Sequence, residues 1–245
     1  MSKVLLTRPL DQSVSLTEKL KVHDIECAVA PMLEIESMVS AIPPVNHAQA
    51  LVFSSQHGVN MFSRRCRENE VDARHLPAYC VGDATSAAAE RAGFKKIRNA
   101  KGDGADLERL VLASTKPEGG VIVHVRGADV ANDLAKSLQT KGYQTESTVI
   151  YNARTSEGIE KEIMNEMYAG EIPYVMFFSP RTAETFGILG RNQGFAAAAP
   201  QMTAICMSRA VAEAARVAAH WRSVRIADEP REQAMIDCLR DLVEG

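Results

Sequence analysis

Residues 52–62, VFSSQHGVNMF, place a short apolar run before a serine turn and a helix-type segment, and this stretch decides the fold. The same arrangement returns 124 positions later in residues 176–186, MFFSPRTAETF, where Ser179 matches Ser55. A β-branched or aromatic run followed by a helical stretch is typical of one strand–helix unit of a parallel sheet. The repetition therefore predicts an α/β protein with an internal duplication.

A second pair of segments supports the duplication. With a shift of 118, residues 7–20, TRPLDQSVSLTEKL, match residues 125–138, VRGADVANDLAKSL, and Arg8 matches Arg126. A few identities can arise by chance between any two strand–helix pairs, but the preserved order of several units favours true repeats. Ten strands are predicted, too many for one small sheet but suited to two sheets of five. They cover residues 4–7, 25–30, 51–54, 79–82, 96–99, 121–125, 145–151, 174–179, 203–206 and 224–227.

Composition limits the class of protein. The 245 residues allow one large domain or two small ones, and 46% hydrophobic with 24% charged residues is ordinary for a soluble globular chain. The net charge of -3 gives no general attraction for nucleic acid or an acidic membrane, so an anionic ligand has to be held by local groups. The five cysteines form no CxxC pair and no apolar run approaches membrane-spanning length, which together predict reduced thiols and a cytoplasmic location.

Polar residues follow many of the predicted strands. In open parallel sheets, ligands lie beyond the carboxyl ends of the strands, where helix amino termini offer N–H groups to anions. The alternative for each serine or threonine is a helix N-cap, a role compatible with binding through the same turn. The candidate binding residues at these ends are Thr7, Arg8, Ser54, Ser55, Gly82, Arg126, Gly127, Ser179, Arg181 and Ser208.

Motifs for several other chemistries are missing. The six histidines show no HExxH or paired metal spacing, and the sequence contains neither a GxSxG elbow nor a GxxxxGK[ST] loop. An open parallel sheet can hold a flavin at its strand ends, but no flavin motif is visible.

Taken in order, several blocks resemble the uroporphyrinogen-III synthase family of tetrapyrrole biosynthesis, from about residue 3 to residue 242. The blocks are VLLTRP with APMLEI, LVFSSQHGVNMF, VGDATSAAAERAGF, VHVRGADVANDLAKSLQTKGY, STVIYNA, FFSPRTAETF and ADEPREQAMIDCL. One block departs from the family: residues 204–210 read AICMSRA where the family usually has IGPTTA, so Ser208 is the hydroxyl that remains in that turn.

The resemblance implies a fold of two flavodoxin-like lobes, each a five-stranded parallel sheet flanked by helices, joined by a two-stranded linker. Lobe one would comprise residues 1–36 and 154–245, and lobe two, residues 37–153, would be inserted into it. The linker would use residues 33–37 and 152–156, and two crossings allow a hinge. The strand ends of both lobes would then face one cleft.

The resemblance also implies an activity. A family member is a cyclising hydro-lyase that takes hydroxymethylbilane, an open chain of four pyrroles with eight carboxylates, removes water, inverts the last ring and gives uroporphyrinogen III. The chemistry needs no cofactor and no metal, and a monomer with a transient contact to the upstream bilane-forming enzyme is expected. Among the candidate binding residues, Arg8, Arg126 and Arg181 would pair with carboxylates, since guanidinium groups do so bidentately.

Two residues are expected to take part in the chemistry. Tyr151 matches the tyrosine of the family's VY block, and a phenol can donate a hydrogen bond to the departing hydroxyl. Thr85 matches the threonine of the VGxAT block. The alternative for Tyr151 is a core tyrosine, and the alternative for the whole chain is a two-lobed small-molecule binding or sensing protein of the same fold without catalysis.

Overall fold

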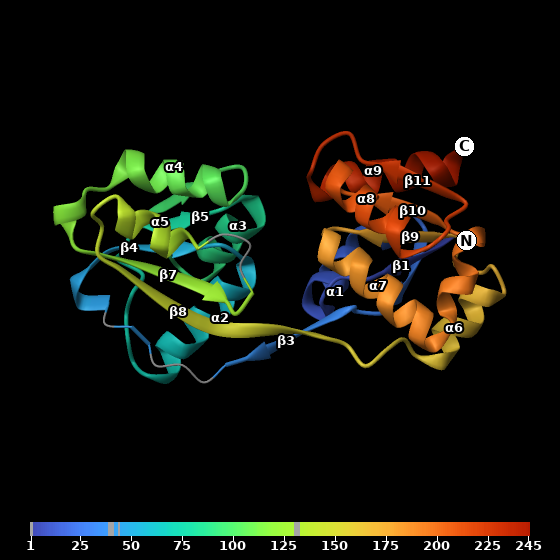
Figure 1. Cartoon of the computed structure of the whole chain (residues 1–245), viewed down its shortest axis with the longest axis horizontal. Coiled ribbons are helices and arrows are strands. Elements are labelled where there is room, and N and C mark those ends of the chain that lie inside the picture. Colours follow the sequence, from blue (N-terminus) through green and yellow to red (C-terminus); the bar gives the residue numbers. More distant parts are fainter. Residues whose placement is uncertain (1, 39–41, 44, 130–132) are drawn as a thin grey trace. The chain divides into compact units, whose positions relative to one another are not determined.

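The computed structural model describes residues 2–38, 42–43, 45–129 and 133–245, so part of the 125–138 repeat lies outside the described residues. The chain divides into two compact units, which we call unit 1, Met1–Glu34 with Arg154–Gly245, and unit 2, Ile35–Ala153. The chain passes from one unit to the other within β3 (Leu33–Ser37) and again within β8 (Thr145–Thr155) (Figure 1).

Unit 1 is built on a five-stranded sheet in the order β11-β10-β9-β1-β2, and all four neighbouring pairs are parallel. This sheet has the five parallel strands that we expected. Its elements are β1 (Ser2–Leu6), α1 (Leu10–Lys21), β2 (Ile25–Val29), α6 (Lys161–Tyr168), β9 (Tyr174–Phe177), α7 (Pro180–Gln193), the 3-10 helix η3 (Phe195–Gln201), β10 (Thr203–Cys206), α8 (Arg209–Ala218), β11 (Ser223–Ile226) and α9 (Glu232–Glu244).

Unit 2 contains a six-stranded sheet in the order β3-β8-β7-β4-β5-β6, in which β8 to β6 pair in parallel. Besides β3 and β8, its elements are η1 (Val45–His47), β4 (Ala48–Phe53), α2 (Gln56–Glu68), β5 (Ala78–Cys80), α3 (Asp83–Arg91), β6 (Ile97–Asn99), α4 (Gly104–Ser114), η2 (Pro117–Gly119), β7 (Val121–Gly127) and α5 (Leu134–Thr140).

The prediction of a five-stranded, all-parallel second sheet is wrong by one strand. Residues 33–37, which we expected only in the linker, extend the sheet as β3 beside β8. The amide of Met38 donates to the carbonyl of Ile150 at 2.9 Å, and the amide of Ser156 donates to that of Met32 at 3.1 Å. The two segments therefore run in opposite directions as an antiparallel pair, and it is their continuity with the sheet of unit 2 that differs from the expected five strands.

The two sheets share one spatial order when the repeats are matched. Strands β1 and β2 correspond to β7 and β8, and β9, β10 and β11 correspond to β4, β5 and β6. Read in this way, β2-β1-β9-β10-β11 and β8-β7-β4-β5-β6 are the same arrangement. Apart from β3, each unit thus combines two strands of one copy with three strands of the other. In both, the direction of strand addition reverses between the matched pairs β1/β9 and β7/β4, which are the topological switch points.

The hydrophobic cores of the two units are also alike, since helices cover both faces of each sheet. In unit 1, α1 and α9 pack on one face and α7 and α8 on the other, while in unit 2 α4 and α5 lie opposite α2 and α3. The matched phenylalanines make the same edge-on contact in each unit, with ring centroids 5.8 Å apart for Phe53 and Phe62 and 5.4 Å apart for Phe177 and Phe186. The repeated sequence therefore gives repeated packing.

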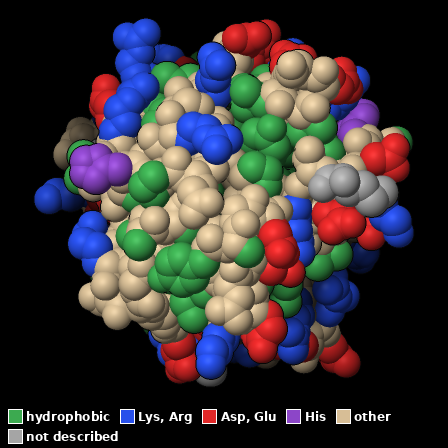
Figure 2. Space-filling view, turned by 90° about the vertical axis from the view of Figure 1, so that its right-hand side faces the viewer, with side chains coloured by type: hydrophobic (Ala, Val, Ile, Leu, Met, Phe, Trp, Pro, Cys, Tyr) green, Lys and Arg blue, Asp and Glu red, His purple; other side chains and the backbone are tan. Residues whose placement is uncertain are grey.

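The surface in Figure 2 carries acidic and basic side chains interspersed around a centre of hydrophobic and uncharged atoms, so neither sign of charge dominates this face. Within the described ranges, no helix has the length and apolar character that a membrane span requires.

Candidate functional site

Most of the candidate residues lie at the two switch points. In unit 1, Thr7 and Arg8 follow β1, while Ser179 and Arg181 follow β9. At the switch point of unit 2 the candidates are Ser54, Ser55, Arg126 and Gly127. The others lie one strand away from a switch point: Gly82 and Thr85 follow β5, and Ser208 follows β10.

The switch point of unit 2 brings the serine loop and the candidate tyrosine together. Ser55 is the N-cap of α2, and its Oγ accepts a hydrogen bond from the amide of Gly58 at 3.1 Å. The same Oγ lies 2.8 Å from the hydroxyl of Tyr151, which comes from β8 on the far side of β7. Both side chains are half-buried, so the pair is fixed by the protein and still reaches solvent.

Gly127 creates the space in which this tyrosine lies. A Cβ at this position would come within 2.6 Å of Cζ and 3.0 Å of the hydroxyl oxygen of Tyr151. The register between β7 and β8 also shifts between Arg126 and Gly127, and the amide of Ala128 donates to the carbonyl of Tyr151 at 2.8 Å. Glycine is required here because the aromatic ring crosses directly over its backbone.

Sequence reasoning missed His57 as a neighbour of this pair. Its ring centroid is 5.8 Å from that of Tyr151, and the side chain is buried. The available signal was its place in the SSQHG loop, two residues after Ser55, but a single histidine without metal spacing gave no reason to select it.

Arg126 is held beside the same strand end by three oxygen atoms. Its Nε donates to Oγ of Ser147 at 2.8 Å, and Nη1 donates to the carbonyls of Gly127 at 3.0 Å and Ala128 at 3.2 Å. The side chain is half-buried, so its guanidinium is oriented by these bonds and remains available to solvent. This geometry suits the predicted role of pairing with a carboxylate.

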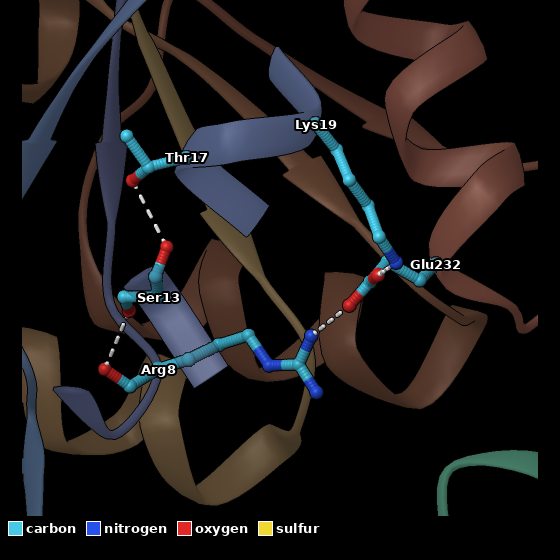
Figure 3. A network of polar contacts seen from close by, with 5 residues as sticks. All are labelled: Arg8, Ser13, Thr17, Lys19 and Glu232. Carbon is cyan, nitrogen blue, oxygen red and sulfur yellow. Dashed lines mark hydrogen bonds and ion pairs between the residues drawn. The ribbon is translucent and has the colours of Figure 1, made fainter. Parts of the chain in front are cut away.

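Arg8, the counterpart of Arg126 in unit 1, has a different environment. Its Nη1 lies 2.5 Å from a carboxylate oxygen of Glu232, whose other oxygen lies 2.5 Å from Nζ of Lys19 (Figure 3). The guanidinium also stacks at 4.2 Å over the ring of Phe178, and Nε has no hydrogen-bond partner in the described part of the chain. An incoming carboxylate would have to compete with Glu232.

The pKa values of Arg8 and Glu232 are shifted both by burial and by the charges and hydrogen bonds of neighbouring side chains. Burial lowers the pKa of Arg8, and the charge and hydrogen bond of Glu232 oppose that effect without cancelling it. For Glu232, burial raises the pKa, but the hydrogen bonds and charges of Lys19 and Arg8 outweigh it, and the net pKa is lowered. The carboxylate thus stays ionised near neutral pH and balances two cations.

Two of the predicted hydroxyls lie inside the protein. The side chain of Thr7 is fully buried, and its Oγ1 donates to the carbonyl of Met176 at 2.7 Å, which links β1 to β9. Thr85 is 3% exposed in the first turn of α3. In this structure neither side chain is open to a ligand, and their roles in binding and chemistry stay predictions.

The other candidates lie at the starts of helices. Ser179 caps α7 and Ser208 caps α8, their Oγ atoms accepting hydrogen bonds from the amides of Thr182 at 3.2 Å and Val211 at 3.4 Å. Gly82 is the N-cap residue of α3, with open space where a side chain would be. Ser54 directly precedes the cap of α2 and Arg181 is the second residue of α7, and both are half-buried.

We compared the potential metal ligands and the thiols in the part of the chain that the structure describes. No three histidine, cysteine, aspartate or glutamate side chains there are grouped as metal ligands would be. The five cysteines are unpaired, and burial raises the pKa of Cys206 to about 12 and that of Cys80 to about 11. These thiols are poor nucleophiles at neutral pH because the thiolate is hardly populated.

Doubly wound sheets with polar side chains at their switch points define a class of α/β proteins in which small molecules bind at the carboxyl ends of the strands. Within that class, a family model described as uroporphyrinogen-III synthase HemD matches residues 14–237, so the chain belongs to this family. The family expected from the sequence blocks is confirmed.

Relatives and solved structures agree with this assignment. The chain is 24% identical to the porphyrin biosynthesis protein HemD of Ruminiclostridium josui over all of its own length, but it spans only 49% of that protein. It is also 23% identical to the uroporphyrinogen-III synthase of Chlorobaculum parvum, over 76% of this chain and 78% of that one.

Two solved structures share the fold across nearly the whole of both chains. Uroporphyrinogen-III synthetase from Helicobacter pylori is 15% identical, with a TM-score of 0.65 over 99% of this chain and 100% of that one. A mutant uroporphyrinogen III synthase from Thermus thermophilus is 14% identical, with a TM-score of 0.59 over 100% and 99%. At this identity the likeness is one of fold.

Proposed function

We propose that this chain is a uroporphyrinogen-III synthase that cyclises hydroxymethylbilane, with loss of water and inversion of the last pyrrole ring. The observation that carries the proposal is the pair formed by Ser55 and Tyr151 over Gly127, at the switch point of a chain that belongs to the family. A binding or sensing protein would not need the serine loops at Ser55 and Ser179, the Thr85 block and Tyr151 together.

The proposed chemistry needs little beyond positioning. Tyr151 donates a hydrogen bond to the terminal hydroxyl as it departs, and the resulting cation is attacked by the already substituted carbon of the last pyrrole. Because the linear substrate closes unaided to the uninverted isomer, the enzyme's task is to hold the conformer that favours the other attack. Arg126 and Arg181 pair with substrate carboxylates, and Arg8 does so once Glu232 is displaced.

We also propose that the two units are flavodoxin-like lobes joined by a hinge. In unit 1 the strands follow the flavodoxin-type order 2-1-3-4-5, and unit 2 has the matched arrangement, which supports two flavodoxin-like lobes. We propose that β3 and β8 serve as the hinge, and that the enzyme acts as a monomer with a transient contact to the bilane-forming enzyme. We propose no cofactor for the reaction.

The test is to supply freshly made hydroxymethylbilane and to separate the porphyrinogen isomers after oxidation. We expect the inverted isomer to form in excess over a control with heat-inactivated protein. The alternative function predicts binding of the bilane with no change in the isomer ratio. If only the uninverted isomer appears, the chain is not a synthase.

A further inference from the structure

The hydroxyl of Ser55 takes part in two hydrogen bonds, and the direction of the second one has a consequence for Tyr151. The first is fixed, because the amide of Gly58 can only donate and Oγ of Ser55 accepts it at 3.1 Å. The second joins the two hydroxyl oxygens at 2.8 Å, and either oxygen can be its donor. A serine hydroxyl has one proton and two acceptor positions, so both directions are chemically open.

The amino terminus of α2 favours one of these directions. The 13-residue helix α2 begins directly after Ser55 and directs the positive end of its dipole toward this residue. A hydroxyl that already accepts a bond from an N–H group becomes a better donor, because hydrogen bonds in a chain polarise one another. The run from Gly58 N–H through Ser55 O–H to the oxygen of Tyr151 then points in a single direction.

We propose that Ser55 is a positioning residue that donates its proton to the oxygen of Tyr151 and so directs the proton of Tyr151 toward the departing hydroxyl of the substrate. This role rests on the proposed function. It differs from the contact with substrate that the sequence predicted for Ser55, because the serine acts through the tyrosine.

The proton balance of the reaction closes with this arrangement. As the C–O bond breaks, the phenol proton moves to the departing hydroxyl, which leaves as water, and the phenolate keeps the hydrogen bond from Ser55. The substituted pyrrole carbon attacks the resulting cation and gives a spiro intermediate. The bond from this carbon to its original methylene then breaks, and that methylene bonds to the unsubstituted carbon of the same ring. This last carbon loses its proton, which restores the phenol. No oxidant, reductant or further co-reactant is required.

The matched position in unit 1 lacks these features. Ser179 caps α7 as Ser55 caps α2, but its hydroxyl lies 2.7 Å from Oγ1 of Thr182 in the same helix. Strand β2, the counterpart of β8, reads IECAV and contains no tyrosine. The duplicated serines have therefore diverged, and the donor chain belongs to unit 2 alone.

Three replacements at Ser55 separate the possible roles in the full-length protein. Ser55→Thr keeps the hydroxyl, and we expect kcat within about threefold of wild type. Ser55→Ala removes it, and we expect kcat to fall about 10- to 100-fold with KM nearly unchanged. Ser55→Asp still caps α2 through Gly58 but cannot donate, so kcat falls as in Ser55→Ala while Tm stays near that of wild type.

Each competing role predicts a different result. If Ser55 only capped the helix, Ser55→Asp would turn over like wild type. If it only contacted substrate, KM would rise and kcat would hold. Asp103, which caps α4 in the same unit through Ala105 and Asp106, provides the matched control. Asp103→Ala should lower Tm through the lost cap and leave kcat unchanged.

A double-mutant cycle completes the test. Because Ser55 acts through the phenol, Ser55→Ala should cost nothing further in a Tyr151→Phe background, whereas independent roles would give additive losses in kcat. Gly127→Ala, which displaces the ring of Tyr151, should lower kcat as Tyr151→Phe does. Additive losses would overturn the proposal even though wild-type protein formed the inverted isomer, so its failure is distinguishable from failure of the proposed function.

Discussion

His124 lies in the middle of β7 with 2% of its surface exposed, and neither ring nitrogen has a hydrogen-bond partner among the described residues. Burial, and to a smaller extent the charge of Arg126, lower the pKa of His124 to about 4 against the opposing charge of Asp133. A buried imidazole without partners is tolerated only in its neutral form.

His124 should therefore make the stability of the protein depend on pH. Its folded pKa lies below the unfolded value of 6.5, so the unfolded state binds more protons and the free energy of unfolding falls as pH drops from about 6.5 toward 4. At pH 5 the loss should be about 2 kcal/mol relative to pH 7. Urea unfolding of wild type and His124→Leu at both pH values should show a flatter response in the variant. His47→Leu, which removes an exposed histidine of the same unit, should keep the wild-type response, and equal slopes in all three proteins would contradict the prediction.

The sequence predicted which residues belong to the candidate site, but it did not predict which of them contact one another. Ser55 and Tyr151 were each selected from their own blocks, but their hydrogen bond depends on the register shift beside Gly127 and on the space that this glycine leaves. Register between distant strands is set by the whole sheet and cannot be read from a local pattern. The burial of Thr7 has the same origin, because its partner carbonyl belongs to residue 176.

Local sequence patterns predicted the strands and the first residues of several helices. Where the structure differs from the prediction, the difference depends on contacts with segments far away in the sequence. All ten predicted strands are present, and Ser55, Ser179 and Ser208 all cap helices. Residues 33–37 were expected as one strand of the two-stranded linker, and LEIES alternates apolar and charged residues as a half-buried strand does. The place of β3 beside β8 depends on a segment more than 100 residues later in the chain.

The start of α9 is linked to the end of β1 by the ion pair between Glu232 and Arg8. The two side chains are 29% and 16% exposed, whereas Lys19, the other partner of Glu232, is 54% exposed. Glu232→Gln should lower the free energy of unfolding by about 2 kcal/mol, since Arg8 loses its counter-charge and the first turn of α9 loses a favourable carboxylate. Lys19→Gln should cost less than about 1 kcal/mol because exposed pairs contribute little. Denaturant unfolding at pH 7 checks both values, and equal losses would show that burial of the Arg8 pair adds nothing.

Over the whole molecule, the duplication is tandem in sequence but exchanged in space. Apart from β3, the two sheets share one strand order, yet each takes two strands from one copy and three from the other. Periodicity could reveal the copies because it compares segments of sequence. It could not reveal the exchange, which depends on which strands pair, and only the resemblance to the family implied it.

This exchange leaves unit 2 as one continuous segment and unit 1 as two, and it makes a prediction about folding. Residues 35–153 contain the strands β4 to β8 and helices α2 to α5, with apolar clusters on both faces of their sheet, so we expect this segment to fold alone. For unit 1, residues 1–34 can be joined to residues 154–245, because Glu34 and Arg154 are joined by an ion pair of 2.8 Å and a short glycine-serine linker spans the gap.

Circular dichroism and thermal unfolding of the two separate proteins check the prediction, with the full chain as reference. Each should show a cooperative transition, and unit 2 alone should retain the loss of stability toward pH 5 that His124 causes, whereas unit 1 alone should lack it. A unit 2 segment that stays unfolded while the full chain folds would mean that the second lobe depends on the first. The exchange of strands would then be a requirement for folding in addition to a record of duplication.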